Sequence, residues 1–198
     1  MLLDTEHLHH WMQAIRLSND PIRTLDAFWR GQIASKEWLI EHLSHYISAM
    51  PTIEIHGGWV GVLASLLFQT PELKIQHITS VDFDPTCKPI AEEMNRLEAQ
   101  QNRFVAETDN MCNRLPKTSV IINTSCEHIT QEQYDVWLSH MHDDQLLVLQ
   151  SNNYNIAEHI RIAENLNDFR SQSNLSKILY QGELLLPKYT RYMLIGYR

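Results

Sequence analysis

The stretch Thr52-Ile53-Glu54-Ile55-His56-Gly57-Gly58-Trp59-Val60-Gly61 decides how this chain folds. Residues 52–55 read as a short β-strand, and the apolar run 62–68 predicts a buried helix. The chain has only six glycines, and three of them fall at positions 57, 58 and 61. Glycine permits tight bends and close approach of the backbone. We therefore expect a tight connection between a strand and a helix at residues 56–61, called the glycine turn below.

Strands and helices alternate along the chain after the glycine turn. The pattern predicts strands at 78–83, 104–105, 119–123 and 145–150, and helices around 90–97, 134–141 and 156–169. Such alternation is typical of a parallel sheet covered by helices on both faces. Residues 177–186 and 190–197 predict two more strands, whose connection is short enough only for an antiparallel hairpin. The predicted class is therefore α/β, a mostly parallel sheet that ends in an antiparallel hairpin.

Residues 1–50 show helical patterns only, and we predict a helical N-terminal extension (1–50) ahead of one domain at 51–198. Ser35 is placed to cap the last of three helices, which Pro51 ends. The extension has two open roles. It either forms a lid, with Trp29 or Trp38 lining a pocket, or packs against the sheet or a second subunit, so that a dimer is one of the open arrangements.

Composition argues against several classes of protein. Hydrophobic residues make up 43% and charged residues 20% of the chain, as in ordinary globular proteins. Sixteen basic against 24 acidic residues give a net charge of −8, which argues against a nucleic-acid partner. No apolar run is long enough for a membrane span, and the sequence MLLDTEHLHH does not resemble a signal peptide. Three cysteines at no metal-ligand spacing favour a reducing, cytoplasmic location.

The eleven histidines raise the question of a metal site. His7, His9 and His10 form one group, and His140 and His142 form another. Neither group has the i, i+4 spacing that places two imidazoles on one helix face, and no cysteine or glutamate nearby completes a ligand set. Solvated or capping histidines explain them better, so no metal is expected.

Polar residues follow each predicted parallel strand, at the sheet edge where ligands bind in open α/β folds. The glycine turn offers backbone amides at a helix N-terminus, which favours negatively charged groups. Asp82, followed by Phe83, ends the next strand and is placed to bind the two hydroxyls of a ribose. Asp109 and Asn110 follow the third strand, where an adenine-binding loop and a plain surface loop explain them equally well.

The fourth strand ends in the most polar group of all, Asn123-Thr124-Ser125-Cys126-Glu127-His128. Because the preceding strand is apolar and must be buried, this group begins near the centre of the molecule. Packing has no use for a glutamate and a histidine there, so a functional role is favoured. Asn152, Asn153 and Tyr154 follow the fifth strand and form a further polar rim over the same edge.

These features in this order resemble the class I S-adenosylmethionine-dependent methyltransferases over residues 50–198. The resemblance implies a Rossmann-like sheet of seven strands and S-adenosyl-L-methionine as cofactor. It places Glu54 at the methionine end of the cofactor, Gly58 at the central glycine of the family's motif and Asp82 at the ribose. The cofactor-binding residues expected in all are Glu54, His56, Gly57, Gly58, Asp82, Phe83, Asp109, Asn110 and Asn123.

The chain departs from the family pattern in two places. His56 and Val60 stand where the motif has its first and third glycines. The fourth loop also lacks the Asn-Pro-Pro-aromatic signature of enzymes that methylate amino groups of nucleic acids or glutamine. The acceptor therefore cannot be inferred from the resemblance.

The leading hypothesis is methyl transfer to a small-molecule or peptidic acceptor. Such a transfer needs positioning of the reactants and removal of one acceptor proton. Glu127 or His128 is the expected base, with Asn123 beside them. Asn152, Asn153 and Tyr154 are the expected acceptor-binding residues.

Three alternatives stay open from the sequence. The same cofactor could serve non-methyl chemistry, such as transfer or cyclisation of its aminocarboxypropyl arm, which lies beside the altered glycine turn. A nicotinamide-dependent oxidoreductase shares the turn and the acid but differs in glycine spacing and in its sixth strand. A non-catalytic module could also have kept the fold and lost the chemistry.

Overall fold

A seven-stranded sheet in the order β3-β2-β1-β4-β5-β7-β6 runs through the molecule. The computed structural model describes residues 4–47 and 49–198. Strands β1 to β5 pair in parallel, whereas β7 is antiparallel to both of its neighbours, β5 and β6. The strands are β1 (Thr52–His56), β2 (His77–Asp82), β3 (Phe104–Thr108), β4 (Val120–Asn123), β5 (Leu146–Asn152), β6 (Lys177–Leu185) and β7 (Thr190–Tyr197). The predicted Rossmann-like sheet with its terminal hairpin is confirmed.

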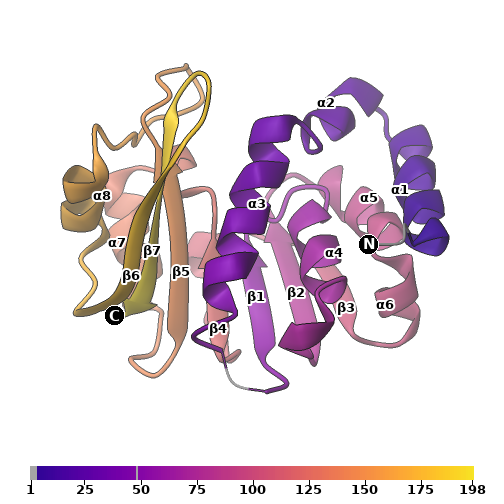
Figure 1. Ribbon diagram of the computed structural model, residues 1–198, viewed down its shortest axis with the longest axis horizontal. Coiled ribbons are helices and arrows are strands. Elements are labelled where there is room, and N and C mark those ends of the chain that lie inside the picture. The colour runs from indigo at the N-terminus through magenta and orange to yellow at the C-terminus, as the bar shows by residue number, and fades with distance from the viewer. Residues whose placement is uncertain (1–3, 48) are drawn as a thin grey trace.

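Helices cover both faces of this sheet (Figure 1). The α-helices are α1 (Thr5–Leu17), α2 (Pro21–Asp26), α3 (Arg30–Leu43), α4 (Val62–Phe68), α5 (Cys87–Met94), α6 (Arg96–Gln100), α7 (Gln131–Ser139) and α8 (Leu166–Ser173). Short 3₁₀ turns lie at η1 (Pro71–Leu73), η2 (Met111–Asn113) and η3 (Cys126–His128). Helices α3, α4 and α5 share one hydrophobic core with β1, and α7 and α8 share another with β4, β5 and β7.

The central strand β1 shows how the two faces are divided. Successive side chains of a strand point to opposite faces. Ile53 and Ile55 accordingly pack into the core beneath α3 and α4. Glu54 and His56 are buried as well, and His56 meets Trp137 of α7 on the opposite face. A strand that is buried on both sides thus carries its polar residues on the α7 face.

The helices of residues 5–43 pack closely on the rest of the chain. Helix α1 lies against α5, and the indole N–H of Trp11 donates to the Ser65 hydroxyl of α4 at 2.9 Å. Helix α3 contacts α4, β6 and β7. Among the described residues, no helix combines the length and the apolar character needed to cross a membrane.

Three sequence-based expectations are wrong in detail. Pro51 does not end the third helix, because α3 already ends at Leu43, with Ser44 as its C-cap. Ser35 does not cap a helix, because α3 already begins at Arg30, and the Ser35 hydroxyl instead donates to Gln150 of β5 at 2.9 Å. The helix expected at 156–169 begins only at Leu166, after the N-cap Asn165. The amides of Ile160 and Arg161 donate to the carbonyl of Glu127 at 2.9 and 3.1 Å, so tertiary hydrogen bonds replace helical ones.

Candidate functional site

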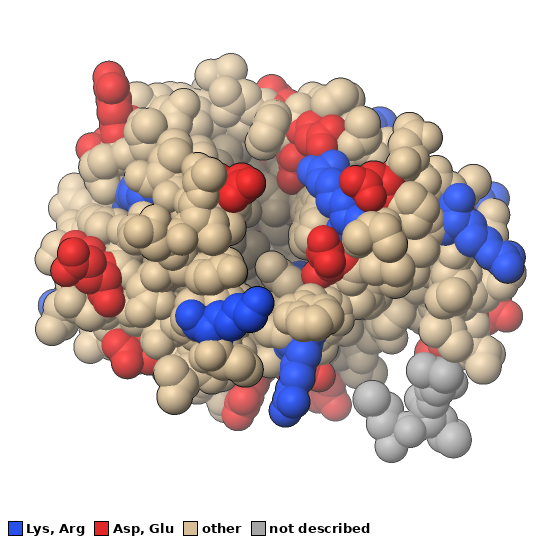
Figure 2. All heavy atoms as spheres, turned by 90° about the horizontal axis from the view of Figure 1, so that it is seen from above, with Lys and Arg blue, Asp and Glu red and all other residues tan. Residues whose placement is uncertain are grey.

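The carboxyl ends of the parallel strands meet at the upper edge of the sheet in Figure 1. Strand β1 lies between β2 and β4, so the chain leaves it toward one side of the sheet and later returns on the other. Open α/β sheets form their ligand crevice at this switch point. Figure 2 looks onto this edge and shows a hollow near its centre.

The glycine turn is held by close packing of its own glycines. Gly57 and Gly61 have positive φ angles of 66° and 82°, which residues with a side chain rarely adopt. A Cβ on Gly57 would lie 2.4 Å from the Ser125 hydroxyl, and one on Gly58 would lie 2.0 Å from the Ser80 hydroxyl. The glycines therefore let the turn pack against the ends of β2 and β4. A side chain on Gly58 would thus collide with other atoms of the protein itself.

Asp82 fastens the glycine turn to the end of β2. Its Oδ2 accepts from the Trp59 amide at 2.8 Å, and its Oδ1 accepts from the Asp84 amide at 3.0 Å. Each carboxylate oxygen can accept more than one hydrogen bond, so further acceptor capacity remains. Phe83, the next residue, is 80% exposed. An exposed aromatic residue thus directly follows this carboxylate in the chain.

A cleft of about 370 Å³ lies beside this turn, lined by Trp59, Val60, Asp84, Thr86 and residues of the α1–α2 connection. The indole Nε1 of Trp59 is buried and has no hydrogen-bond partner among the described residues. A buried donor without a partner costs free energy unless a ligand or water satisfies it. Trp59 thus lines the cleft and also carries a buried donor that the described residues leave unsatisfied.

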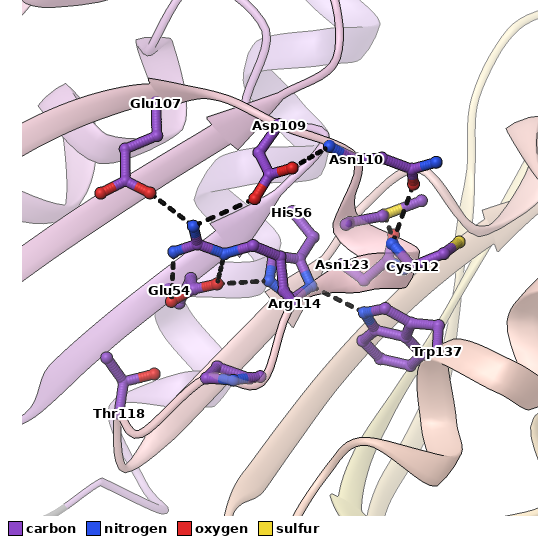
Figure 3. A network of polar contacts seen from close by, with 12 residues as sticks. Glu54, His56, Glu107, Asp109, Asn110, Cys112, Arg114, Thr118, Asn123 and Trp137 are labelled. Carbon is purple, nitrogen blue, oxygen red and sulfur yellow. Dashed lines mark hydrogen bonds and ion pairs between the residues drawn. The ribbon is translucent and has the colours of Figure 1, made fainter.

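Glu54 belongs to a charged network on the α7 face of the sheet (Figure 3). Arg114 donates to both Glu54 oxygens, at 3.0 Å from Nε and 3.3 Å from Nη2. Its Nη1 also contacts Glu107 and Asp109, at 2.5 and 3.3 Å. Figure 3 shows the Arg114 guanidinium among these three carboxylates. The connection from β3 to β4 thus supplies the cation that neutralises a buried acid of β1.

His56 links the same network to α7. Its Nδ1 accepts from the indole N–H of Trp137 at 2.7 Å, which places the ring proton on Nε2. That Nε2 donates to Glu54 Oε1 at 2.8 Å. Burial has the largest effect on Glu54 and acts to raise its pKa, but the hydrogen bonds from His56 and Arg114 lower that pKa below its ordinary value overall. The hydrogen bond with Glu54 has the opposite effect on the partner: it raises the pKa of Arg114.

In the loop after β3, where an adenine-binding role was considered, two side chains accept hydrogen bonds from the loop's own backbone. Asp109 Oδ1 accepts from the Asn110 amide at 2.8 Å, and Asn110 Oδ1 accepts from the Cys112 amide at 2.9 Å. Asn110 is thereby the N-cap of η2. The Asp109 amide donates to the Asp82 carbonyl at 3.0 Å, whereas its carboxylate lies toward Arg114, and so toward Glu54.

The ends of β4, β5 and β7 form a second polar group, centred on Glu127. Glu127 is 1% exposed, and its Oε1 accepts from Asn152 Nδ2. Nη2 of Arg191 lies 3.5 Å from the same oxygen. Glu127 Oε2 and Arg191 Nε are buried without a hydrogen-bond partner among the described residues. Asn152 and Arg191 are direct cross-strand neighbours, so the sheet itself assembles this group.

The remaining predicted residues surround this second group. Asn123 is fully buried at the end of β4, and its Oδ1 accepts from the Ser125 amide at 2.9 Å. Asn153 accepts from the Thr190 amide at 2.8 Å, and Tyr154 stacks on Tyr189 with ring centroids 5.2 Å apart. Both contacts tie the segment after β5 to the β6–β7 hairpin. His128 is exposed beside Glu127.

Sequence reasoning missed three cations that complete the site, namely Arg114, Arg191 and Lys36. Lys36 of α3 donates to Gln32 Oε1 at 3.0 Å. Burial and the nearby charge of Arg191 lower the pKa of Lys36 to about 7. One signal was available, because Arg191 is a charged residue near the start of an otherwise apolar predicted strand, 190–197. Nothing in the sequence pairs Arg114 with Glu54.

Comparison with known proteins finds no matching family model and no matching curated protein. Solved structures do match. The magnesium protoporphyrin IX methyltransferase of Synechocystis PCC 6803 with bound SAM has a TM-score of 0.63 and 16% identity, over 96% of this chain and 90% of that one. The N-methyltransferase NodS of Bradyrhizobium japonicum WM9, in complex with S-adenosyl-L-homocysteine, has a TM-score of 0.64 and 11% identity, over 94% and 98%.

This chain has the class I methyltransferase fold. The fold that the resemblance implied is thereby confirmed. A ribosomal protein L11 methylase from Lactobacillus delbrueckii also matches, with a TM-score of 0.58 and 13% identity over 82% of this chain and 76% of that one. The named acceptors of these similar structures range from a porphyrin to a ribosomal protein. At such identities the likeness establishes the fold alone, and function has to be argued from the site.

The packing of Gly58 can be tested by a double-mutant cycle. Gly58→Ala should destabilise the protein by about 1–3 kcal/mol, because the new Cβ collides with the Ser80 hydroxyl. Ser80→Ala in the same chain should recover most of that loss. Urea denaturation measures both. Gly31→Ala is the control, since its Cβ would meet ordinary contacts at 3.4 Å or more. A loss that Ser80→Ala leaves unchanged would contradict the packing argument.

Removal of the Arg114 cation should destabilise the protein in a pH-dependent way. Breaking a fully buried pair costs about 3–5 kcal/mol. The Arg114 side chain is 21% exposed, so Arg114→Met should cost about 1–3 kcal/mol at neutral pH. Because the folded-state pKa of Glu54 is lowered, its stabilising effect is complete above the ordinary pKa and is lost as the pH falls through the folded-state value.

The difference between wild type and Arg114→Met should therefore shrink as the pH falls below about 4.3, the ordinary pKa of glutamate. Chemical denaturation at several pH values measures it. Arg16→Met, at an exposed position of α1, is the matched control and should change stability little. A difference that grows toward acidic pH would rule out the ion pair as its source.

Proposed function

We propose that this protein is an S-adenosylmethionine-dependent methyltransferase that acts on a small-molecule or peptidic acceptor. The observation that carries the proposal is the Asp82 carboxylate, fixed by the Trp59 amide at the switch point of the sheet. The fold supports it, because similar structures were crystallised with SAM or S-adenosyl-L-homocysteine. When bound, the cofactor would supply an electrophilic methyl group, and the residues of this chain would bind and orient the reactants.

The cofactor side of the proposed site is the glycine turn and the loops after β2 and β3. Asp82 would bind the ribose hydroxyls, with Phe83 and the Asp109–Asn110 loop toward the base. The backbone of Gly57 and Gly58 would contribute through its close approach. Glu54 and His56 are already engaged by Arg114 and Trp137, so we assign them to the support of the turn.

The acceptor side is the group at the ends of β4, β5 and β7. The Glu127 carboxylate would stabilise positive charge at the reacting centre, and Asn152 holds it in place. His128 and Asn123 stay the neighbouring candidates for contact with the acceptor. Asn153 and Tyr154 would shape the rim next to the hairpin. The buried Arg191, with Nε unpaired among the described residues, favours an acceptor that carries oxygen atoms.

Chemistry on the aminocarboxypropyl arm is a second candidate, and one observation favours it. The acid of the family's glycine motif, Glu54, is neutralised by Arg114, which changes the surroundings expected at that end of the cofactor. Product analysis separates the two reactions. Methyl transfer releases S-adenosylhomocysteine, whereas transfer of the arm releases methylthioadenosine.

Asp82→Ala tests the proposed ribose contact. Loss of two hydrogen bonds to a charged acceptor should weaken S-adenosylmethionine and S-adenosylhomocysteine alike by about 2–4 kcal/mol, or roughly 30- to 700-fold in Kd. Both ligands should respond equally because both contain the ribose. Isothermal titration calorimetry measures the two affinities.

The matched control is Asp143→Ala, in the exposed loop between α7 and β5, and it should leave both affinities unchanged. Circular dichroism checks that Asp82→Ala is folded, because the same carboxylate also holds the Trp59 amide. Unchanged affinity in a folded Asp82→Ala protein would remove the ribose assignment. Absence of binding by the wild type would remove the proposed function.

A further inference from the structure

Three potential metal ligands come together on the acceptor side, although they are far apart in the sequence. Glu127 and His128 belong to η3, and His159 lies in the irregular segment between β5 and α8. Each offers one ligand atom, and these atoms lie within 4.8 Å of one another. The hydrogen bonds from the Ile160 and Arg161 amides to the Glu127 carbonyl hold the two segments together, at 2.9 and 3.1 Å.

Both imidazoles are oriented in the way that metal-binding histidines usually are. His128 Nδ1 lies 3.0 Å from the Glu158 carbonyl, and His159 Nδ1 lies 2.8 Å from the Tyr154 carbonyl. A carbonyl only accepts hydrogen bonds, so in each ring Nδ1 carries a proton and Nε2 is the nitrogen left to face a metal. Metal-ligating histidines typically donate their second ring N–H to such an oxygen, which fixes the tautomer and the ring orientation.

The Glu127 carboxylate supplies the independent observation that points to a cation. The residue is 1% exposed, and its Oε2 has no hydrogen-bond partner among the described residues. Asn152 and Arg191 both approach the other oxygen, Oε1. A buried carboxylate oxygen without a partner is costly, and proteins retain one where an ion or ligand completes it.

We propose that Glu127, His128 and His159 bind a divalent transition metal ion, with zinc as the reference ion. Two imidazoles and one carboxylate suit zinc or iron, whereas magnesium and calcium prefer oxygen ligands alone. Three protein ligands leave a coordination position open, as in catalytic rather than structural zinc sites. Zinc–nitrogen bonds of about 2.0–2.1 Å require ligand atoms roughly 3.3 Å apart, so the three ligand atoms, now within 4.8 Å of one another, would draw closer on binding.

The proposal changes the role of the residues expected to act as the base. A bound metal with an open position could hold an oxygen or nitrogen atom of the acceptor and lower its pKa, which serves the same purpose as a base. No metal was expected from the sequence, because His128 and His159 are far apart in the chain and no local spacing links them. The proposal does not depend on methyl transfer, since metal affinity can be measured without cofactor or acceptor.

Metal titration of the full-length protein tests the site directly. The protein is stripped with a chelator and dialysed, and zinc binding is then measured by calorimetry. We expect one equivalent of zinc in the wild type, and at least tenfold weaker binding in His128→Gln, in His159→Gln and in Glu127→Gln. Cobalt should give visible absorption bands of a four- or five-coordinate site in the wild type but not in these three variants. His142→Gln, an exposed histidine before β5, is the matched control and should bind zinc as the wild type does.

Two results would overturn the proposal. One is the absence of stoichiometric zinc binding in the stripped wild type. The other is unchanged zinc affinity in both His128→Gln and His159→Gln, which involve partly or fully exposed side chains and should leave the fold intact. Asp82→Ala should bind zinc normally, and the histidine variants should bind S-adenosylhomocysteine normally. Failure of the metal site and failure of the proposed function are therefore distinguishable.

Discussion

The hydrogen-bonded chain Trp137–His56–Glu54–Arg114 is the constraint on which the rest of the structure depends. Strand β1 is central, and two of its residues place polar side chains in the interior. Buried polar groups must be satisfied, and networks of them tolerate little displacement. The Nδ1 of His56 finds its donor, the Trp137 indole, only with α7 in its present position. The Glu54 carboxylate finds its cation only with Arg114 in the β3–β4 connection. One strand thus fixes the helix behind the sheet and the loop beside the glycine turn.

The same chain explains why the glycine motif can depart from the family pattern. His56 occupies the position of the motif's first glycine, yet its side chain points to α7 and away from the turn. The turn itself begins one residue later, at Gly57, where the positive φ is found. Gly57 and Gly58 then pack against Ser125 and Ser80, so that the turn rests on the strands next to β1. A histidine is tolerated because the register of β1 sends it to the opposite face.

Sequence patterns predicted the parts of the fold that depend on local periodicity and on turn chemistry. The order of strands and helices, the glycine turn and the C-terminal hairpin follow from these. Hydrogen bonds between distant segments could not be predicted in this way. The helix expected from residue 156 fails because the Glu127 carbonyl takes the amides of Ile160 and Arg161. The same contact brings His159 to Glu127 and His128, about 30 residues away in sequence.

The site divides into two halves, which differ in whether their buried polar atoms have hydrogen-bond or ionic partners. The Glu54 network has a partner for each charge, and its role is to hold the turn. At the ends of β4, β5 and β7, by contrast, Glu127 Oε2, Ser151 Oγ and Arg191 Nε are buried without partners among the described residues. Unsatisfied buried atoms are rare, so their concentration at three adjacent strand ends needs a physical reason. The proposed binding of an acceptor on this half would supply one, because its polar atoms would complete these groups.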